Sequence, residues 1–147
     1  TSLDDWNKVI AGNLTSAFLG AKSQIPSMLK SGGGSIIFTS SFVGTSVGIP
    51  GMSLYGAAKA GLIGLVKGIT ADYGAQGIRA NALLPGGVDT PMAGSDAQKE
   101  WAAGLHAMKR IAQPEEIAQA ALFLAGPMAS FVSGSALYAD GGNSAVK

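Results

Sequence analysis

Residues Ile78-Arg79-Ala80-Asn81-Ala82-Leu83-Leu84-Pro85-Gly86-Gly87 form a largely apolar run that ends in a proline and two glycines. We expect a β-strand from Ile78 to Leu84, because short apolar runs bounded by turn residues are typical of strands. Pro85 stops this strand, since proline has no N–H to donate to a neighbouring strand. The turn that follows would lie at the carboxyl edge of a sheet, where α/β proteins bind their ligands.

Strand and helix patterns alternate on both sides of this run. Ser35–Thr39 is a short apolar strand of the kind that is buried in a parallel sheet. Apolar residues recur at helical spacing in several other segments. We expect helices from near Ser2 to near Pro26, from near Met52 to near Tyr73, and over 96–108 and 114–124, with a last strand at Ala136–Ala139. This alternation predicts an α/β fold in which right-handed crossovers join parallel strands.

Composition leaves ample material for a core and excludes several classes of partner. Hydrophobic residues make up 47% of the 147 residues, charged residues 13%, and the net charge is +1. Because no Lys/Arg cluster is present, we expect neither nucleic acid nor a membrane as a partner. The chain has no cysteine, so we predict no disulfide, no thiolate nucleophile and no cysteine metal site. We expect no metal-binding residues elsewhere in the chain. Its apolar stretches are too short to cross a bilayer and its start does not resemble a signal peptide, which predicts a cytoplasmic location.

Tyr55 and Lys59 lie four residues apart in an expected helix, and therefore on one face of it. A phenol beside an ammonium group is suited to proton transfer, because the cation favours the phenolate. Ser41, just after the preceding strand, could donate a hydrogen bond to an oxygen on which charge develops. The competing interpretation is a solvated Tyr–Lys pair that extends along the protein surface.

The order of the motifs along the chain favours the catalytic interpretation. The series is Asn13 in a helix, Ser40-Ser41-Phe42-Val43-Gly44 after a strand, Tyr55-x-x-x-Lys59, Arg79-x-Asn81, Pro85-Gly86-Gly87-Val88-Asp89-Thr90 and Asp140-Gly141-Gly142. It resembles the C-terminal two-thirds of the short-chain dehydrogenase/reductase family, over nearly the whole chain. The resemblance implies an α/β fold that is the C-terminal part of a doubly wound, parallel-sheet Rossmann-like fold.

The resemblance also implies a role for each catalytic candidate. Tyr55 would be the general acid in carbonyl reduction and the general base in alcohol oxidation, and Lys59 would assist it and hold the nicotinamide ribose. Ser41 would orient the substrate oxygen, with Ser40 as the alternative if the next loop packs differently. Asn13 would keep a water that links Lys59 to solvent. From the residues alone, a structural asparagine with its own hydrogen bonds is the competing interpretation.

By the same resemblance the cofactor is NAD or NADP, and the sequence does not separate the two. Tyr55 and Lys59 would contact it together with the segment that starts at Pro85. Gly86 would allow close backbone approach, Val88 would present main-chain atoms to the nicotinamide carboxamide, and the Thr90 hydroxyl would bond to that group. A tight turn in which Thr90 caps the next helix is the alternative, and both can be true.

Part of the family pattern is missing. The chain has no glycine-rich turn between a first strand and a first helix, and no acid after a second strand, which together hold the rest of a dinucleotide. We therefore interpret residues 1–147 as a single partial domain, the catalytic and substrate-binding part of an enzyme that interconverts a secondary alcohol and a carbonyl. Two other classes stay open: an inert α/β fragment that folds and oligomerises, and a binding module without catalysis.

Such a partial domain predicts a homo-oligomer. The strand at Ser35–Thr39 would have an unpaired edge, and apolar surface would stay uncovered. We expect a dimer or tetramer held by the helices that begin near Ser2 and Met52. The small-molecule substrate would be covered by residues 92–108, whose single histidine, His106, we expect at the surface. We interpret Asn81 and the Asp140–Gly142 turn as structural.

Overall fold

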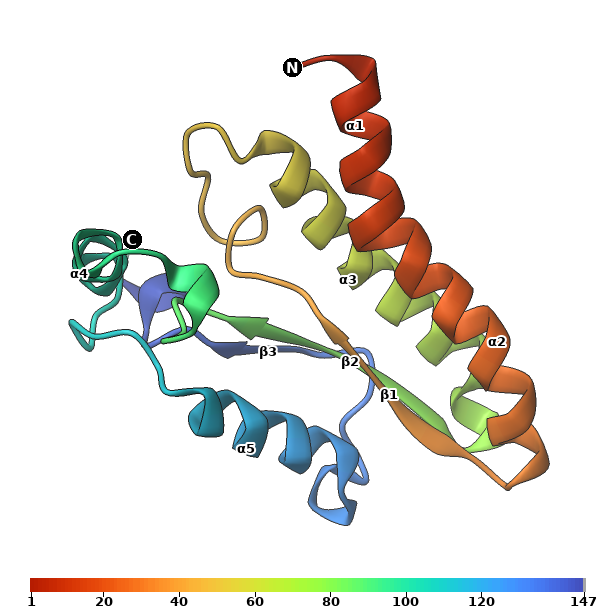
Figure 1. The fold of residues 1–147 in the computed structure, drawn as a ribbon. Helices are drawn as coiled ribbons and strands as arrows, with labels where there is room; N and C mark the ends of the chain where they lie inside the picture. The colour runs from red at the N-terminus through yellow and green to blue at the C-terminus, as the bar shows by residue number, and fades with distance from the viewer. Residues whose placement is uncertain (147) are drawn as a thin grey trace.

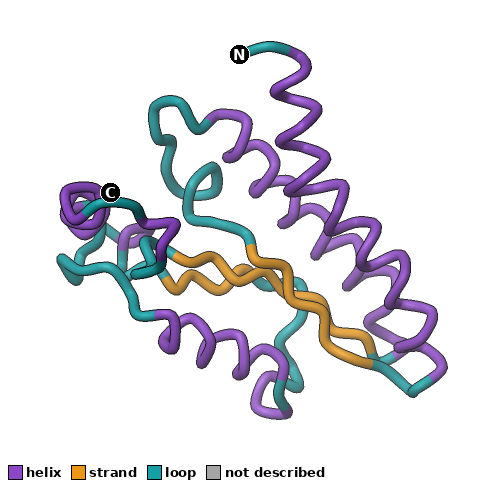
Figure 2. Tube along the Cα trace, viewed as in Figure 1, coloured by secondary structure: helices purple, strands orange, loops and turns teal. Residues whose placement is uncertain are grey.

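The computed structural model describes residues 1–146 as a parallel sheet between two layers of helices (Figure 1). α2 (Ser16–Lys30) and α3 (Ser53–Tyr73) lie over one face of the sheet, and α5 (Pro114–Ala125) covers the other. Strands form the middle layer, while loops and short helices gather at one end of it (Figure 2). The predicted fold class, α/β with helices on both faces of a Rossmann-like sheet, is confirmed.

The sheet consists of three parallel strands in the order β1 (Gly34–Thr39), β2 (Ile78–Pro85) and β3 (Ala136–Ala139). Thr39 pairs with Leu83 and Pro85 pairs with Ala139, so the carboxyl ends of the strands meet at one edge. β2 is central and buried on both faces. The predicted strands and their parallel direction are confirmed, and β1 lies at the sheet edge as expected.

The N-terminal helical segment has three parts. α1 (Leu3–Ile10) starts after Ser2, whose hydroxyl accepts the Asp5 N–H at 3.1 Å while the Asp5 carboxylate accepts the Ser2 N–H at 3.0 Å. A π-helical turn at Ala11–Thr15 joins α1 to α2. α2 contains Pro26 and continues to Lys30, beyond the predicted end. The proline removes only one N–H from the helix, and bonds in the last turn, such as the Ser31 N–H to the Ser27 carbonyl at 3.1 Å, remain.

α3 provides the central part of the apolar core. Three of its buried residues recur at helical spacing along one side and belong to the core cluster: Leu62, Val66 and Ile69. They pack with Ile25 of α2 and with alternate residues of the strands. Burying one side chain of this size contributes about 1.5–3 kcal/mol. This packing therefore fixes the position of the first two turns of α3, which carry Tyr55 and Lys59.

Hydrogen bonds hold α5 against the opposite face of the sheet. The Arg79 guanidinium donates to the Leu124 carbonyl at 2.9 Å and to the Val132 carbonyl at 3.2 Å. The bond to Leu124 satisfies a carbonyl group that the end of α5 leaves free. The Asn81 amide donates to the Val132 carbonyl at 2.8 Å and its oxygen accepts the Ser135 N–H at 3.1 Å. Asn81 is fully buried, and its predicted structural role is confirmed.

α4 (Asp96–Gly104) is shorter than the helix predicted over 96–108. It starts at a capping box in which Ser95 and Gln98 bond to each other's backbone N–H. The chain then turns, with Lys109 in the left-handed region at a φ of 54°. The Met108 N–H donates to the Gly141 carbonyl at 3.0 Å. Residues 105–108 leave the helix because they contact the turn after β3 instead.

Candidate active site

A cleft of about 410 Å³ opens at the carboxyl edge of the sheet, between the loops that follow β1 and β2 and the first two turns of α3. Eight of the predicted positions or their alternatives line it: Ser40, Ser41, Tyr55, Lys59, Pro85, Gly86, Val88 and Thr90. Met92, Ala93 and Ala102, from the segment expected to cover substrate, complete one side. Residues far apart in the sequence therefore surround one space, at the edge where parallel sheets bind ligands.

Lys59 is held in place by the end of β1. Its Nζ donates to the Thr39 carbonyl at 2.9 Å and lies 5.5 Å from the centroid of the Tyr55 ring. Both side chains are half-buried. Burial lowers the pKa of the Lys59 ammonium from its ordinary value. The pair is therefore not a solvated surface pair: the cation is fixed beside the phenol at the floor of the cleft.

Ser40 and Ser41 are both buried but differ in what their hydroxyls do. The Ser40 hydroxyl donates its single hydrogen to the Lys59 carbonyl at 2.8 Å. The Ser41 hydroxyl accepts the Val43 N–H at 3.1 Å. Since an accepting hydroxyl keeps its own hydrogen for another partner, Ser41 is the serine of the pair that can still donate into the cleft.

Two glycines bring the loop after β1 against α3. Gly44 has a φ of 87°, and a Cβ added to it would lie 2.3 Å from the Gly56 carbonyl oxygen. A side chain at Gly44 would therefore force the loop away from the helix. Because Gly56 directly follows Tyr55, this contact sets the separation between the Ser41 loop and the phenol.

The Pro85–Thr90 segment forms the opposite wall. It pairs with the stretch after α4: the Asp89 N–H donates to the Ala112 carbonyl and the Ala112 N–H donates to the Gly87 carbonyl, each at 2.8 Å. Thr90 precedes the short helix at Pro91–Ala93, but among the described residues its side chain makes no capping hydrogen bond. The structure therefore does not support the alternative in which the Thr90 hydroxyl caps this helix.

An ion pair links this wall to α4. Lys99 Nζ lies 2.7 Å from the Asp89 carboxylate. The hydrogen bond from Lys99 lowers the pKa of the Asp89 carboxyl and, in return, raises the pKa of Lys99. The residues that cover the cleft are therefore connected electrostatically to the segment predicted to contact a cofactor.

Asn13 is the one predicted catalytic residue that does not line the cleft. It lies in the π-helical turn of the N-terminal segment and is half-buried. Its amide nitrogen donates to the Val9 carbonyl at 3.1 Å. π-Helical turns are frequent at functional sites, and this turn packs against α3. Its side-chain oxygen stays available for another donor.

The prediction that His106 lies at the surface is wrong. Its side chain is 2% exposed and its Nε2 accepts the Gly87 N–H at 2.9 Å. The cause is the early end of α4, which turns the following residues inward, onto the loops after the strands. Sequence reasoning missed this contact because one histidine outside any periodic pattern carries no signal of burial; the glycines at Gly86 and Gly87, which make room for it, were the available hint.

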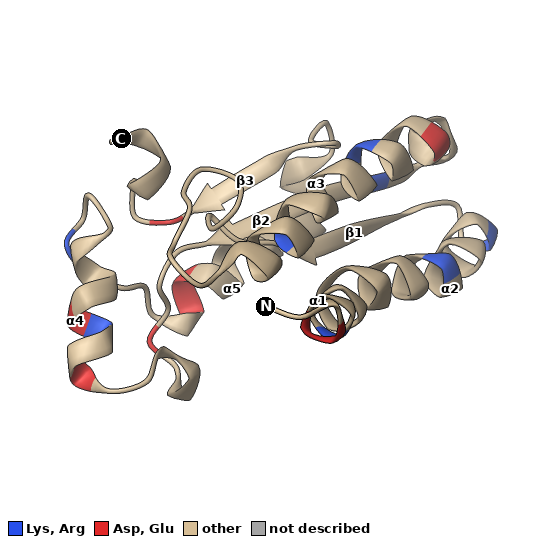
Figure 3. Cartoon of the chain, turned by 90° about the horizontal axis from the view of Figure 1, so that it is seen from above, with Lys and Arg blue, Asp and Glu red and all other residues tan. Residues whose placement is uncertain are grey.

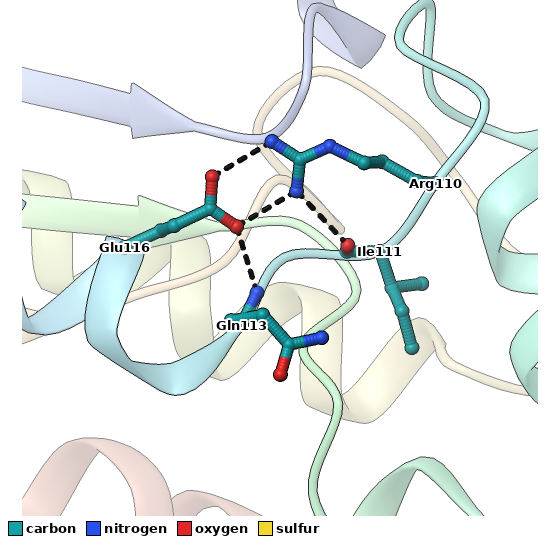
Figure 4. Close-up of polar contacts among 4 residues, drawn as sticks. All are labelled: Arg110, Ile111, Gln113 and Glu116. Carbon is teal, nitrogen blue, oxygen red and sulfur yellow. Dashed lines mark hydrogen bonds and ion pairs between the residues drawn. The ribbon is translucent and has the colours of Figure 1, made fainter.

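Arg110 and Glu116 fix the start of α5 near the same region (Figure 4). The guanidinium donates to both carboxylate oxygens at 2.7 Å, and the carboxylate also accepts the Gln113 N–H at 2.8 Å. These bonds lower the pKa of Glu116 from 4.5 to about 2. The bonds from Arg110 have the largest effect, and the bond from the Gln113 N–H comes next. This depressed carboxyl stabilises the fold above the unfolded pKa, and its contribution is lost as pH falls from 4.5 toward about 2.

Three further features of the described chain concern metal ligands, charge and membrane-spanning helices. Residues 1–146 contain no group of three or more His, Cys, Asp or Glu side chains placed to hold a metal ion. Basic and acidic side chains are interspersed over the helices and loops (Figure 3). No helix in that range combines the length and the apolarity that crossing a membrane requires.

Comparison with known proteins explains this arrangement. A family model described as enoyl-(acyl carrier protein) reductase matches residues 1–144. The 3-oxoacyl-[acyl-carrier-protein] reductase of Chlamydia trachomatis is 42% identical over 144 residues, which are 96% of this chain and 57% of that protein. The chain belongs to the short-chain dehydrogenase/reductase family. Another similar protein is the cyclohexanol dehydrogenase of an Acinetobacter strain. It is 40% identical over a match that covers 95% of this chain and 55% of the dehydrogenase.

Solved structures of this family share the fold. The gluconate 5-dehydrogenase of Burkholderia cenocepacia, solved with NADP and tartrate, gives a TM-score of 0.92 at 31% identity. The match covers 100% of this chain and 59% of the dehydrogenase. The aldohexose dehydrogenase of Thermoplasma acidophilum gives a TM-score of 0.90 at 36% identity. The match covers 98% of this chain and 61% of the dehydrogenase. The chain thus spans little more than half the length of the short-chain dehydrogenases and reductases that it matches.

The cleft suits one end of a dinucleotide. The Lys59 cation can bind hydroxyls of a ribose. The Thr90 hydroxyl, which makes no capping hydrogen bond in the described chain, and the backbone beside Val88 can bind an amide. Within residues 1–146, no glycine-rich turn joins a first strand to a first helix, so the family's usual contact with the pyrophosphate is not made by the described residues.

Proposed function

We propose that this chain is the catalytic and substrate-binding part of an NAD(P)-dependent oxidoreductase that interconverts a secondary alcohol and a carbonyl. The observation that carries the proposal is the single cleft in which Ser41, Tyr55 and Lys59 face the Pro85–Thr90 segment. Neither a binding module nor a structural protein needs a phenol, a fixed cation and a free hydroxyl donor together. The nicotinamide would supply or accept the hydride, because no side chain can carry it.

Tyr55 moves the proton in this proposal. In carbonyl reduction its O–H gives a proton to the oxygen of the substrate, and in alcohol oxidation its oxygen receives that proton. Lys59, held by the Thr39 carbonyl, stabilises the negative charge on Tyr55 and binds the nicotinamide ribose. Ser41 donates to the same substrate oxygen and orients it. Asn13 holds a water near Lys59 through its free side-chain oxygen.

The 147 residues would be one partial domain of a longer polypeptide. The matched relatives are longer by a wide margin, since the chain covers 57% of the Chlamydia reductase. The pyrophosphate and adenosine would bind to a preceding segment, which would also pair with the free edge of β1. That segment would decide between NAD and NADP.

The substrate would enter beside residues 92–108. Met92 is 95% exposed and lines the cleft, as do Ala93 and Ala102. A small, apolar wall of this kind suits the carbon chain of a substrate whose alcohol or carbonyl group reaches Ser41 and Tyr55. The names of two relatives specify a 3-oxoacyl-[acyl-carrier-protein] and cyclohexanol, and each of these combines an apolar carbon skeleton with a carbonyl or hydroxyl group.

A direct assay tests the proposed function. The longer polypeptide is mixed with NADPH or NADH and a panel of ketones, namely an acetoacetyl thioester, cyclohexanone and a keto sugar acid, and absorbance of the reduced nicotinamide is followed. We expect one cofactor to be oxidised only when a ketone is present, with one alcohol formed per cofactor consumed. Tight cofactor binding with no turnover on any ketone would favour the binding module instead.

The isolated 147-residue chain should behave differently from an enzyme. We expect it to be a dimer or tetramer, because Phe18 and Leu19 are 49% and 53% exposed beside an apolar groove of about 530 Å³ between α2 and α3. It should also bind NAD(P)H weakly, since the pyrophosphate contact is missing. Light scattering and a fluorescence titration with NADPH measure the two properties.

A matched variant separates the groove from the rest of the apolar surface. Phe18→Ser lies in the groove and should release monomers, whereas Phe131→Ser, at a fully exposed position outside it, should not. A monodisperse monomer that binds NADPH at micromolar affinity would contradict both the oligomer and the partial domain. An oligomer that never binds NAD(P)H, even within the longer polypeptide, would support the inert fragment.

A further inference from the structure

His106 lies where the loops after all three strands converge. Its ring meets the Phe42 ring, from the loop after β1, edge-on at 5.7 Å between centroids. It accepts the Gly87 N–H, after β2, at 2.9 Å. Gly141, after β3, lies so close that a Cβ there would be 3.2 Å from the His106 Cβ. The buried His106 side chain thus contacts the loops that follow all three strands.

The loop after β2 is shaped around this imidazole. A Cβ added to Gly86 would lie 2.6 Å from His106 Cε1 and 2.9 Å from the Asp140 Cα, and one added to Gly87 would lie 3.1 Å from Nε2. At a distance under 3.0 Å something must shift, and the Asp140 Cα belongs to the backbone. Gly86 is therefore needed for the ring to approach this loop, and Gly87 keeps the contact with Nε2 from becoming tight.

The hydrogen bond fixes the protonation state of the ring. Because Nε2 accepts the Gly87 N–H, it carries no hydrogen, and the neutral ring has its proton on Nδ1. Nδ1 is buried without a partner among residues 1–146. A second proton would place an N–H group against the Gly87 N–H and break the contact. Only neutral His106 can hold the loop.

We propose that His106 is a positioning residue for cofactor binding: its Nε2 holds the Gly87 N–H and so keeps the Pro85–Thr90 segment in the conformation that receives the nicotinamide. This inference rests on the function proposed above. His106 does not line the cleft and touches no reacting atom, so it acts through the loop alone. Protonation of the ring would release the loop and weaken cofactor binding.

The surroundings of the ring favour the neutral form. Burial lowers the pKa of His106, and Asp140 opposes this effect, first through the charge of its carboxylate and then through its backbone. Asp140 is engaged by the Gly142 and Ser144 N–H groups at 3.0 and 2.9 Å. Arg110 and Glu116 line the adjacent pocket but bind each other, and Asp89 is paired with Lys99.

The sign of the pH dependence follows from this lowered pKa. The folded-state pKa lies below the unfolded value of 6.5. Above 6.5 the ring is neutral in both states, so the loop contact is complete. Stability is lost as pH falls below 6.5, and the contact itself is lost as pH passes through the folded-state pKa.

The first experiment needs no cofactor. The 147-residue chain contains one histidine, so its imidazole nitrogens are assigned without ambiguity in a ¹⁵N NMR spectrum. We expect Nε2 to be unprotonated and to accept a hydrogen bond at pH 7, and the Gly87 amide resonance to shift along the same pH curve as the imidazole. A proton on Nε2, or a Gly87 amide that does not follow the imidazole, would overturn the proposal.

The second experiment measures cofactor affinity in the longer polypeptide by fluorescence titration with NADPH and with NADH. His106→Gln places a carbonyl oxygen near the position of Nε2, whereas His106→Asn places its polar atoms near Nδ1 and cannot reach Gly87. We expect the Asn variant to raise the cofactor Kd about 10-fold, the effect of leaving one buried N–H unpaired. The Gln variant should keep most of the affinity and lose the weakening of binding at acid pH.

A control separates positioning from general stability. Thr70→Val removes the hydrogen bonds of Thr70 with the Ala80 carbonyl and Ser133, at the far end of β2. We expect it to lower the melting temperature without changing the Kd. If the Gln and Asn variants bind cofactor equally, the ring serves only to fill space and the proposal fails. If the wild type binds neither NADPH nor NADH, the proposed function fails, and the NMR result still decides whether His106 holds the loop.

Discussion

Tyr55→Phe should lower kcat by about 10²–10⁴-fold in the longer polypeptide, the usual effect of removing a general acid–base group. The substitution deletes the oxygen that moves the proton and keeps the ring. Cofactor affinity should stay close to wild type, because Lys59 keeps its hydrogen bond to the Thr39 carbonyl. Steady-state kinetics with the ketone identified in the assay above, and a fluorescence titration with NADPH, measure the two quantities separately.

Two matched tyrosines serve as controls for this prediction. Tyr73→Phe at the end of α3 and Tyr138→Phe on β3 remove the same oxygen elsewhere, and both should retain kcat. A Tyr55→Phe variant with more than a tenth of the wild-type kcat would remove Tyr55 from the proposed mechanism, whatever the controls do.

Lys59→Met should lower both kcat and cofactor affinity. The ammonium is half-buried, 5.5 Å from the centre of the Tyr55 ring, so its loss removes the charge that favours the phenolate. It also removes the donor to the nicotinamide ribose. We expect kcat to fall by at least about 10²-fold, comparable with the loss of one electrostatic donor at an active site. The limb of the pH–rate profile that follows ionisation of the phenol should move to higher pH.

Lys67 provides the comparison for this variant. It lies about two turns further along α3 and is exposed, so Lys67→Met makes the same chemical change without touching the cleft. We expect its kinetics and pH profile to match the wild type. If the limb stays at the same pH in Lys59→Met, another cation acts on the phenol and the assignment of Lys59 is wrong.

The sequence was a good guide wherever a local pattern decides the structure. Helical spacing placed Tyr55 and Lys59 on one face of α3, and the strand ends placed Ser41 and Pro85 at one edge of the sheet. Such features depend on hydrogen bonds and apolar contacts within about ten residues. The order of the motifs then identified the family, which the comparisons confirm.

The remaining features depend on contacts between distant segments, which one sequence does not reveal. α4 ends at Gly104 because Met108 bonds to Gly141, 33 positions further along the chain. The same contact buries His106, which was expected at the surface. The choice between Ser40 and Ser41 likewise needed a hydrogen bond to Lys59 that no spacing rule predicts. The roles of all the predicted site residues stay predictions: Asn13, Ser41, Tyr55, Lys59, Pro85, Gly86, Val88 and Thr90.

The π-helical turn at Ala11–Thr15 has a consequence for how the chain can change in length. A π turn holds one more residue than an α turn over the same rise. Each residue of an α-helix rotates the chain by about 100°. Deleting one residue between 11 and 15 would therefore rotate α2 against α1, and Ile25 would leave the core that it shares with α3. The length of this segment is constrained more tightly than its composition.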